Sequence, residues 1–238
     1  MSYAPELIEA LRPVSTGTLT TVLLKKGLRN VWIRGAFEIG SPGERMVAEA
    51  FTLRFVPARE DQATPESWAS PTSTRAAIEA MPPGCVAIAD ASGGVADAGI
   101  FGDILAARMV RRGVAGLITD GVMRDIEGVR GTGLRVFARG VAAPPSVAGL
   151  TFVGWQQPIG CGGVAVFPGD LIVADQDGAV VIPQALVSEV VPLAVEQERF
   201  EIWVMQEVQR GVALPGLYPP DAGTKARYTA SVEALARS

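Results

Sequence analysis

Apolar residues recur at helical spacing between residues 102 and 113. This stripe consists of Leu105, Ala106, Met109 and Val110. Gly102-Asp103 opens the predicted helix, and Gly113 stands where a left-handed closing residue belongs. Arg111 and Arg112 lie outside the stripe and suit the negative end of the helix dipole. The pattern therefore predicts a helix that packs one face against a sheet.

A short apolar run follows this helix. Val114–Thr119 predicts a buried strand, which Asp120-Gly121 ends. The next polar residues are Arg124 and Asp125. Because a strand–helix–strand unit lays its helix on the sheet, we expect this pair to return to the start of the helix.

The rest of the chain alternates between helices and strands. In the first half, the predicted elements are helices at 4–11 and 15–26, a strand within 43–57, an inserted polar loop at 58–73, a helix at 74–81, a strand at 85–89 and a Gly-rich loop at 90–99. In the second half, they are a helical turn at 126–130, strands at 134–138, 151–153, 164–167, 170–174 and 179–183, a tight turn at 175–178 and a long helix at 185–210. Ser15 or Thr16 is the expected N-cap of the second helix, and Gly27 ends it.

The predicted helix at 185–210 carries more apolar side chains than one helix on a sheet needs. They include Leu186, Val190, Leu193, Val195, Phe200, Trp203 and Val204. We therefore expect a neighbouring subunit to cover part of it. Glu198 or Glu201 is a candidate to approach the neighbour's site. In the tail at 212–238 we expect a short amphipathic stretch.

Mixed helices and strands, with neither an internal repeat nor a long linker, predict an α/β fold with a mixed sheet. We expect a single compact domain over residues 1–238. It would include the N-terminal helices (4–26) and the C-terminal helix with its tail (185–238).

The composition narrows the class of protein. Apolar residues make up 48% of the chain, enough for a buried core, but no apolar run is long enough to span a bilayer. The N-terminus lacks a signal-peptide pattern, so we expect a soluble cytoplasmic protein.

The net charge is −4, and the one basic cluster, Arg108–Arg112, fits a solvated helix face, so nucleic acid is not an expected partner. Cys85 and Cys161 lie in apolar surroundings and are expected to be buried free thiols.

The chain contains no histidine. This excludes Ser-His and Cys-His nucleophilic pairs and histidine-based zinc or iron sites. Any metal would have oxygen ligands, which favours Mg²⁺ or Mn²⁺ held by few carboxylates and several waters. Glu127, two residues after Asp125, is a candidate to support such waters.

The start of helix 102–113 offers anion-binding chemistry. The backbone N–H groups of Ile104 and Leu105 have no intrahelical acceptor, and the helix dipole adds to their attraction for an anion. Arg124 carries a planar fork that matches a carboxylate, and Asp125 offers an oxygen ligand for a hard divalent cation. This combination suits a small 2-oxo acid chelated to a metal. The alternative is an ordinary α/β unit with a capping aspartate and a surface Arg-Asp pair.

Asp103, followed after twenty residues by Arg124-Asp125, resembles the signature of the class II pyruvate aldolases. These are typified by 4-hydroxy-4-methyl-2-oxoglutarate/4-carboxy-4-hydroxy-2-oxoadipate aldolase, and the same superfamily includes the regulator of ribonuclease E activity A. The run PGDLIVADQDGAVVIP at 168–183 and the segment Gly160–Val164 resemble it too, so the similarity covers roughly residues 10–210. The resemblance implies a ββα swivelling-type sandwich, assembled as a homotrimer or a dimer of trimers.

The resemblance also implies a metal-dependent lyase that cleaves a 4-hydroxy-2-oxo acid to pyruvate and a second carbonyl compound. Asp125 would hold the Mg²⁺ or Mn²⁺, and Arg124 would polarise the 2-oxo group and stabilise the enolate. Asp103 would orient a metal-bound water that acts as general base. The substrate carboxylate would be bound by the backbone amides of Gly102, Asp103, Ile104 and Leu105. Oxaloacetate decarboxylation would follow from the same chemistry; a non-catalytic, protein-binding regulator of a ribonuclease is the alternative.

Overall fold

The computed structural model describes residues 3–236. The strands are β1 (Phe37–Glu38), β2 (Met46–Pro57), β3 (Val86–Asp90), β4 (Gly116–Thr119), β5 (Val122–Met123), β6 (Val136–Ala138), β7 (Gly140–Val141), β8 (Leu150–Trp155), β9 (Ile159–Cys161), β10 (Val164–Val166), β11 (Leu171–Asp175) and β12 (Gly178–Ile182). The α-helices are α1 (Pro5–Leu11), α2 (Thr16–Lys25), α3 (Thr74–Ala80), α4 (Asp103–Arg111), α5 (Ile126–Gly131), α6 (Val187–Gln209) and α7 (Ala222–Ala236). Short 3₁₀ segments are η1 (Pro65–Ala69), η2 (Ser146–Ala148) and η3 (Gln184–Leu186).

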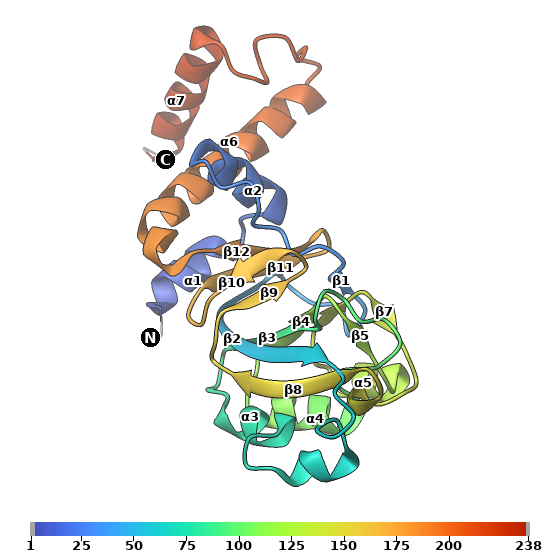
Figure 1. The fold of residues 1–238 in the computed structure, drawn as a ribbon. Helices are drawn as coiled ribbons and strands as arrows, with labels where there is room; N and C mark the ends of the chain where they lie inside the picture. The colour runs from blue at the N-terminus through green and yellow to red at the C-terminus, as the bar shows by residue number, and fades with distance from the viewer. Residues whose placement is uncertain (1–2, 237–238) are drawn as a thin grey trace.

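The main sheet is mixed, and its strands run in the order β1-β6-β4-β3-β2-β11-β12 (Figure 1). Neighbours among β2, β3, β4 and β6 are parallel, whereas β1, β11 and β12 join antiparallel. The long strand β2 pairs with β11 through residues 46–49 and with β8 through residues 53–57. The two ends of β2 therefore pair with two different strands. The α/β fold with a mixed sheet predicted from the sequence is confirmed.

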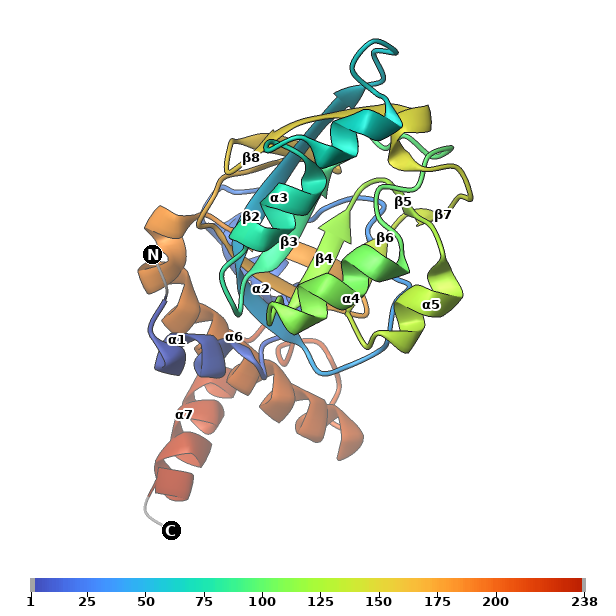
Figure 2. The same cartoon turned by 90° about the horizontal axis from the view of Figure 1, so that it is seen from below.

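Helices α3, α4 and α5 lie on one face of this sheet (Figure 2). Alternate residues of β2, among them Phe51 and Phe55, point to this face because side chains alternate along a strand. They share a buried cluster with Ile78 of α3 and Met109 of α4. Val110, a member of the predicted apolar stripe, is instead 39% exposed, because α4 turns Ala106 and Met109 inward.

The hairpin β9–β10 covers the other face of the same strands. Its apolar side chains form a second buried cluster with residues such as Ile88 and Ile118. The buried carboxylate of Asp120 accepts hydrogen bonds from Ala91 N at 2.8 Å and Gly162 N at 3.0 Å, and so links the end of β4 to this hairpin. Burial raises the pKa of Asp120. Cys161 of the hairpin is a buried free thiol, as predicted, and so is Cys85.

Helices α1, α2 and α6 pack on the β11–β12 end of the sheet and form a third buried cluster. The predicted cap of α2 is confirmed: Ser15 Oγ accepts from Thr18 N at 3.0 Å. Glu198 and Glu201 of α6 accept hydrogen bonds from Ser15 N and from Thr18 Oγ1. In this chain these two glutamates therefore dock α2 against α6.

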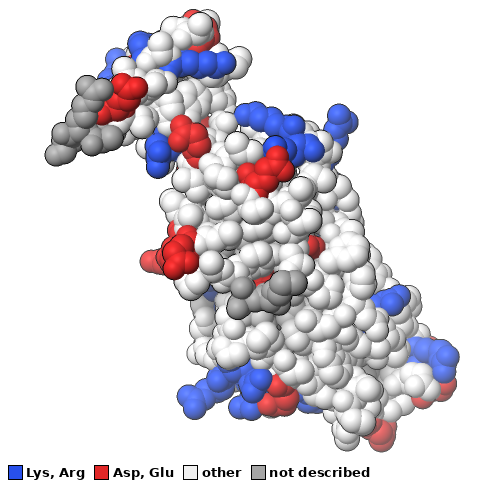
Figure 3. All heavy atoms as spheres, turned by 90° about the vertical axis from the view of Figure 1, so that its left-hand side faces the viewer, with Lys and Arg blue, Asp and Glu red and all other residues white. Residues whose placement is uncertain are grey.

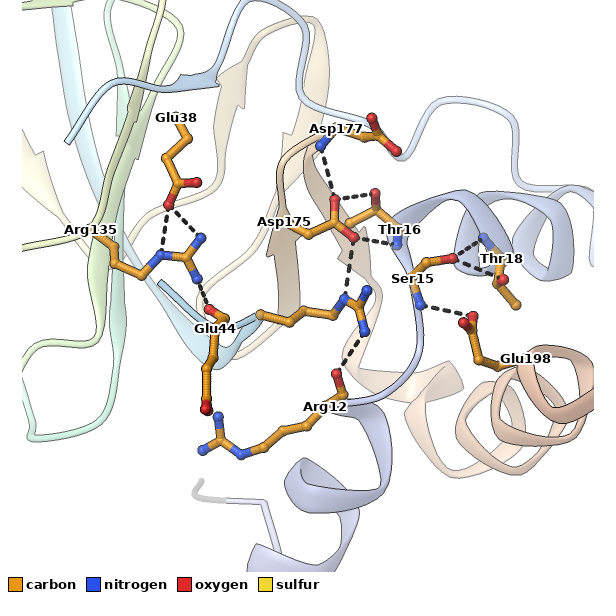
Figure 4. Close-up of polar contacts among 11 residues, drawn as sticks. Arg12, Ser15, Thr16, Thr18, Glu38, Glu44, Arg135, Asp175, Asp177 and Glu198 are labelled. Carbon is orange, nitrogen blue, oxygen red and sulfur yellow. Dashed lines mark hydrogen bonds and ion pairs between the residues drawn. The ribbon is translucent and has the colours of Figure 1, made fainter. Parts of the chain in front are cut away.

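One carboxylate joins α2 to the β11–β12 hairpin (Figure 4). Asp175 accepts from the hydroxyl and the amide of Thr16 at 2.7 and 2.9 Å, from Asp177 N at 3.0 Å and from Arg45 Nε at 3.2 Å. Burial opposes ionisation of Asp175, but these four donors together outweigh it and lower its pKa. The predicted tight turn is confirmed, since Asp175 pairs directly with Gly178.

The second half of α6 and all of α7 extend away from the sheet (Figure 1). Helix α6 confirms the predicted long helix, and Gly211, at a φ of +92°, follows its end. Where the sequence predicts only a short amphipathic stretch, α7 spans 15 residues. Phe200 and Trp203 of α6 contact Tyr228 of α7 at ring-centroid distances of 5.1 and 5.5 Å, which holds the two helices together.

The face that Figure 3 shows is largely uncharged in its middle, and its charged side chains gather toward the two ends with both signs interspersed. Among the helices of residues 3–236, none is long and apolar enough to cross a membrane.

Candidate functional site

The start of α4 and the turn after β4 lie side by side. Ile100 N donates to Val122 O at 2.9 Å, and Arg124 N donates to Phe101 O at 3.0 Å. These bonds align the segment before α4 with the short strand β5. They bring the Arg124-Asp125 pair to the start of α4, where the sequence predicts it.

Two glycines make room for the two carboxylates of this site. A Cβ at Gly102 would overlap Asp125 Oδ2, and a Cβ at Gly128 would stand 2.5 Å from Asp103 Oδ2. Neither glycine has a positive φ, so a larger residue at either position would be opposed by the nearby carboxylate and not by the backbone conformation. Asp125 thus lies against the N-cap of α4, and Asp103 lies against α5.

Asp125 adopts a left-handed backbone conformation, with φ +51° and ψ +43°, as the N-cap of α5. Such a conformation is uncommon for residues other than glycine, although aspartate tolerates it better than most. Residues held this way cluster at functional sites. Here the turn directs the Asp125 carboxylate back toward Gly102 instead of along α5.

Arg124 and Asp125 form an ion pair, with Arg124 Nε donating to Asp125 Oδ2 at 3.0 Å. Their side chains are 34% and 42% exposed. A half-exposed pair of this kind contributes little to stability. Within residues 3–236, the second oxygen of Asp125 and the terminal nitrogens of Arg124 form no further hydrogen bond or ion pair.

The first turn of α4 contains the backbone amides predicted to bind an anion. Its first intrahelical hydrogen bond runs from Ala106 N to Gly102 O at 3.0 Å. The backbone amides of residues 103–105 therefore have no intrahelical backbone acceptor. Ile104 N donates to the side chain of its neighbour, Asp103 Oδ1, at 2.7 Å. A bound carboxylate would have to replace this bond in order to use the Ile104 amide.

A cavity of about 210 Å³ lies over this turn and collects the predicted residues. Gly102, Asp103, Ile104, Leu105, Arg124 and Asp125 all line it. Glu127 does not; it is exposed in the first turn of α5. Gly99 of the predicted Gly-rich loop lines the cavity too. The remaining lining residues were not singled out by the sequence, namely Trp68, Thr74, Arg75, Ile100, Phe101, Pro145 and Ser146. They come from loop 58–73, α3, the segment before α4 and the segment around η2, and no local pattern signals that these segments meet.

The site's donor set consists of carboxylate oxygens. In the part of the chain that the structure describes, no group of three or more His, Cys, Asp and Glu side chains could by itself hold a metal. Asp103 and Asp125 nonetheless line one cavity, and the absence of a Cβ at Gly102 leaves space for the Asp125 carboxylate. Mg²⁺ is usually held by one or two carboxylates together with waters and substrate oxygens, so this donor set fits it.

Comparison with known protein families and solved structures identifies the family of this chain. The family model described as "RraA-like: Aldolase/RraA" matches residues 4–181. The chain belongs to the RraA-like family. A solved structure from Pseudomonas syringae pv. tomato superposes with a TM-score of 0.77 at 27% identity, covering 92% of this chain and 99% of that one. Streptomyces coelicolor RraAS2, titled "an unusual member of the RNase ES inhibitor RraA protein family", gives a TM-score of 0.74 at 33% identity, covering 85% and 97%. These neighbours confirm the fold that the resemblance implied.

Several curated relatives of this chain carry aldolase names. A Halalkalibacterium halodurans protein named "Putative 4-hydroxy-4-methyl-2-oxoglutarate aldolase" is 40% identical over 103 residues, which make up 43% of this chain and 48% of the relative. Legionella pneumophila DlpA is 28% identical over 165 residues, 68% of this chain and 26% of that protein. The matched region thus spans about half of the first relative and about a quarter of the second.

Proposed function

We propose that this RraA-like protein is a divalent-metal-dependent lyase that cleaves a 4-hydroxy-2-oxo acid to pyruvate and a second carbonyl compound. The observation that carries the proposal is the convergence of the Arg124-Asp125 pair and the α4 N-terminus on one cavity. The aldolase names of its relatives support the same chemistry. Oxaloacetate decarboxylation is expected as a second activity, because it proceeds through the same pyruvate enolate.

In the proposed reaction, the substrate carboxylate lies at the positive end of α4, and Arg124 donates to the 2-oxo group. When the bond between C3 and C4 breaks, its electron pair forms the C2–C3 double bond of the pyruvate enolate, and the π electrons of the 2-oxo group move onto its oxygen. The 4-hydroxyl loses its proton and becomes the second carbonyl group. Arg124 stabilises the negative charge that develops on that oxygen. Asp103, packed against Gly128, orients a water that relays the 4-hydroxyl proton, and this proton is returned to C3 of the enolate to give pyruvate.

Asp125, which lines the cavity together with Asp103, would hold the divalent cation. When bound there, Mg²⁺ or Mn²⁺ would supply a Lewis acid for the 2-oxo group. The ion pair with Arg124 holds the Asp125 carboxylate against Gly102. It therefore pre-organises both residues for the same ligand.

The test is pyruvate release from 4-hydroxy-4-methyl-2-oxoglutarate and from oxaloacetate. We expect activity to disappear after exhaustive chelation and to return with Mg²⁺ or Mn²⁺. Asp125→Ala should lose metal affinity in calorimetry while its circular dichroism spectrum stays unchanged. Asp97→Ala, which removes an exposed aspartate that does not line the cavity, is the matched control. Full activity of the chelated protein would rule out the proposed mechanism.

The likeness to the Streptomyces coelicolor protein favours a second candidate, a regulator that binds a ribonuclease. Such a regulator would not need the carboxylates of the cavity. Inhibition of a purified RNase E-type nuclease by both wild type and Asp125→Ala, without pyruvate release by either, would support it. Pyruvate release by wild type alone, without nuclease inhibition, would support the lyase.

A further inference from the structure

Arg75 and Trp68 form a stacked pair on the wall of the cavity that holds Arg124. Trp68 belongs to η1 in the loop between β2 and α3, and Arg75 lies in the first turn of α3. The Arg75 guanidinium carbon stands 4.6 Å from the centroid of the Trp68 ring. Both side chains line the cavity together with Arg124 and Asp125.

Arg75 differs from Arg124 and Arg108 in having no acidic partner within residues 3–236. Arg124 pairs with Asp125, and Arg108, on the adjacent helix, pairs with Glu79 at 2.7 Å. Within residues 3–236, Arg75 forms no ion pair, and its one hydrogen bond is a long one, from Nη1 to Thr74 Oγ1 at 3.3 Å. A guanidinium carries five N–H donors, so most of those of Arg75 have no protein acceptor.

The stacking partly fixes this cation before any ligand arrives. An arginine held over an aromatic face loses less freedom when its planar edge then binds a carboxylate. Partial burial disfavours the charged form and lowers the Arg75 pKa, without an anion nearby to offset it. An anion bound at the free edge of the Arg75 guanidinium would offset the cost of burying its charge.

We propose that Arg75, stacked on Trp68, is the residue that binds the distal carboxylate of the substrate and so determines the preference for 2-oxo acids that carry one. The inference rests on the proposed function, in which the first carboxylate and the 2-oxo group occupy the α4 N-terminus and Arg124. The two arginines then hold opposite ends of one small dianion. Asp125 balances Arg124, whereas the charge of Arg75 is balanced by the substrate.

The first experiment measures binding without cleavage. Calorimetry in the presence of Mg²⁺ compares 2-oxoglutarate, which has the second carboxylate, with 2-oxobutyrate, which lacks it. We expect wild type to prefer 2-oxoglutarate by about tenfold to a hundredfold, the range for one charge-assisted contact. Arg75→Ala should abolish this preference and leave 2-oxobutyrate affinity unchanged. Arg75→Lys, which keeps the charge but not the planar stack, should retain part of it.

Arg111→Ala is the matched control, because it removes an exposed arginine of α4 that does not line the cavity. If Arg75 only held loop 58–73 against α3, Arg75→Ala would change the thermal stability, or would change the affinities for 2-oxoglutarate and 2-oxobutyrate equally. The ratio of the two affinities would then stay the same. Equal weakening of both ligands by Arg75→Ala, or an unchanged preference, would overturn the inference.

A kinetic comparison separates this inference from the proposed function. The ratio of kcat/KM for 4-hydroxy-4-methyl-2-oxoglutarate to that for 4-hydroxy-2-oxopentanoate should fall about tenfold or more in Arg75→Ala. If wild type cleaves neither compound but its binding preference depends on Arg75, the lyase proposal fails and the carboxylate site stands. If wild type releases pyruvate and Arg75→Ala keeps the same substrate ratio, the lyase stands and the role of Arg75 is wrong.

Discussion

The carboxylate of Asp125 lies so close to the α-carbon of Gly102 that one added methyl group at residue 102 would overlap Oδ2. Gly102→Ala should therefore displace the carboxylate without a backbone penalty, because the φ of Gly102 is −117°. We expect Mn²⁺ or Mg²⁺ affinity to fall about tenfold to a hundredfold, as when the support of a metal ligand is lost. Calorimetry with each ion measures this directly.

Gly131→Ala is the control for that substitution. Gly131 also has an ordinary φ, and nothing lies within 4 Å of its added Cβ. This variant should bind metal as wild type does. Unchanged metal affinity in Gly102→Ala would show that Asp125 is not the ligand or that its turn yields easily.

Substitution of Arg124 distinguishes a role in the chemical step from a role in substrate binding. Its proposed partner is an oxygen that becomes negative only as the carbon–carbon bond breaks, so its loss should lower kcat and not merely raise KM. We expect Arg124→Ala to lose about 10²–10³ in kcat, or roughly 3–4 kcal/mol. Arg124→Lys should recover only part of the rate, because lysine lacks the planar fork.

Oxalate, an analogue of the pyruvate enolate, gives an independent measure of the same interaction. It should inhibit wild type competitively and Arg124→Ala more weakly. An Arg124→Ala enzyme with normal kcat and a raised KM would make Arg124 a ground-state binding group, contrary to the proposed enolate role.

The four-donor site at Asp175 predicts a pH-dependent stability (Figure 4). The pKa of Asp175 is lowered on folding from its ordinary value of 3.8, so its contribution is fully present above that pH and is lost as the pH falls through the folded pKa. Asp175→Asn should cost roughly 2 kcal/mol at neutral pH, since hydrogen bonds to a charged group are at stake. It should also flatten the decline in stability below about pH 4.

Urea unfolding between pH 2 and pH 7 measures that effect. Asp177→Asn is the control, because Asp177 is exposed and only its backbone takes part in the contacts around Asp175. The prediction fails if the two variants show the same stability profile.

Helix α6 keeps an apolar surface exposed in the single chain. Ile202 and Met205, on the segment that extends from the sheet, are 51% and 58% exposed (Figure 1). A second subunit would bury them, as the predicted homotrimer or dimer of trimers requires. Light scattering at micromolar concentration should show an oligomer, and Met205→Glu should shift it toward smaller species.

Val153→Glu places the same charge at an exposed apolar position of β8, where we expect no effect on assembly. A wild-type monomer in this concentration range would contradict the prediction. If Val153→Glu dissociates the oligomer and Met205→Glu does not, the subunit interface lies on β8 and not on α6.

Features that depend on neighbouring residues were open to prediction from the sequence. The periodicity around Met109 placed helix α4, and the glycine after its last turn marked its end. Ser15 capped α2 as expected, and the turn before Gly178 closed the hairpin. The return of Arg124-Asp125 to the start of α4 also followed from local order, because a strand–helix–strand unit brings the chain back to the same edge.

Contacts between distant segments came only from the tertiary structure. Trp68 and Arg75 join the cavity because loop 58–73 and α3 fold over the start of α4, and no residue spacing encodes that meeting. Asp120 links β4 to a hairpin some forty residues later through Gly162, and β2 changes partner from β11 to β8 along its length. Sequence periodicity specifies which face of an element is apolar, but which element covers that face depends on the packing of the whole chain.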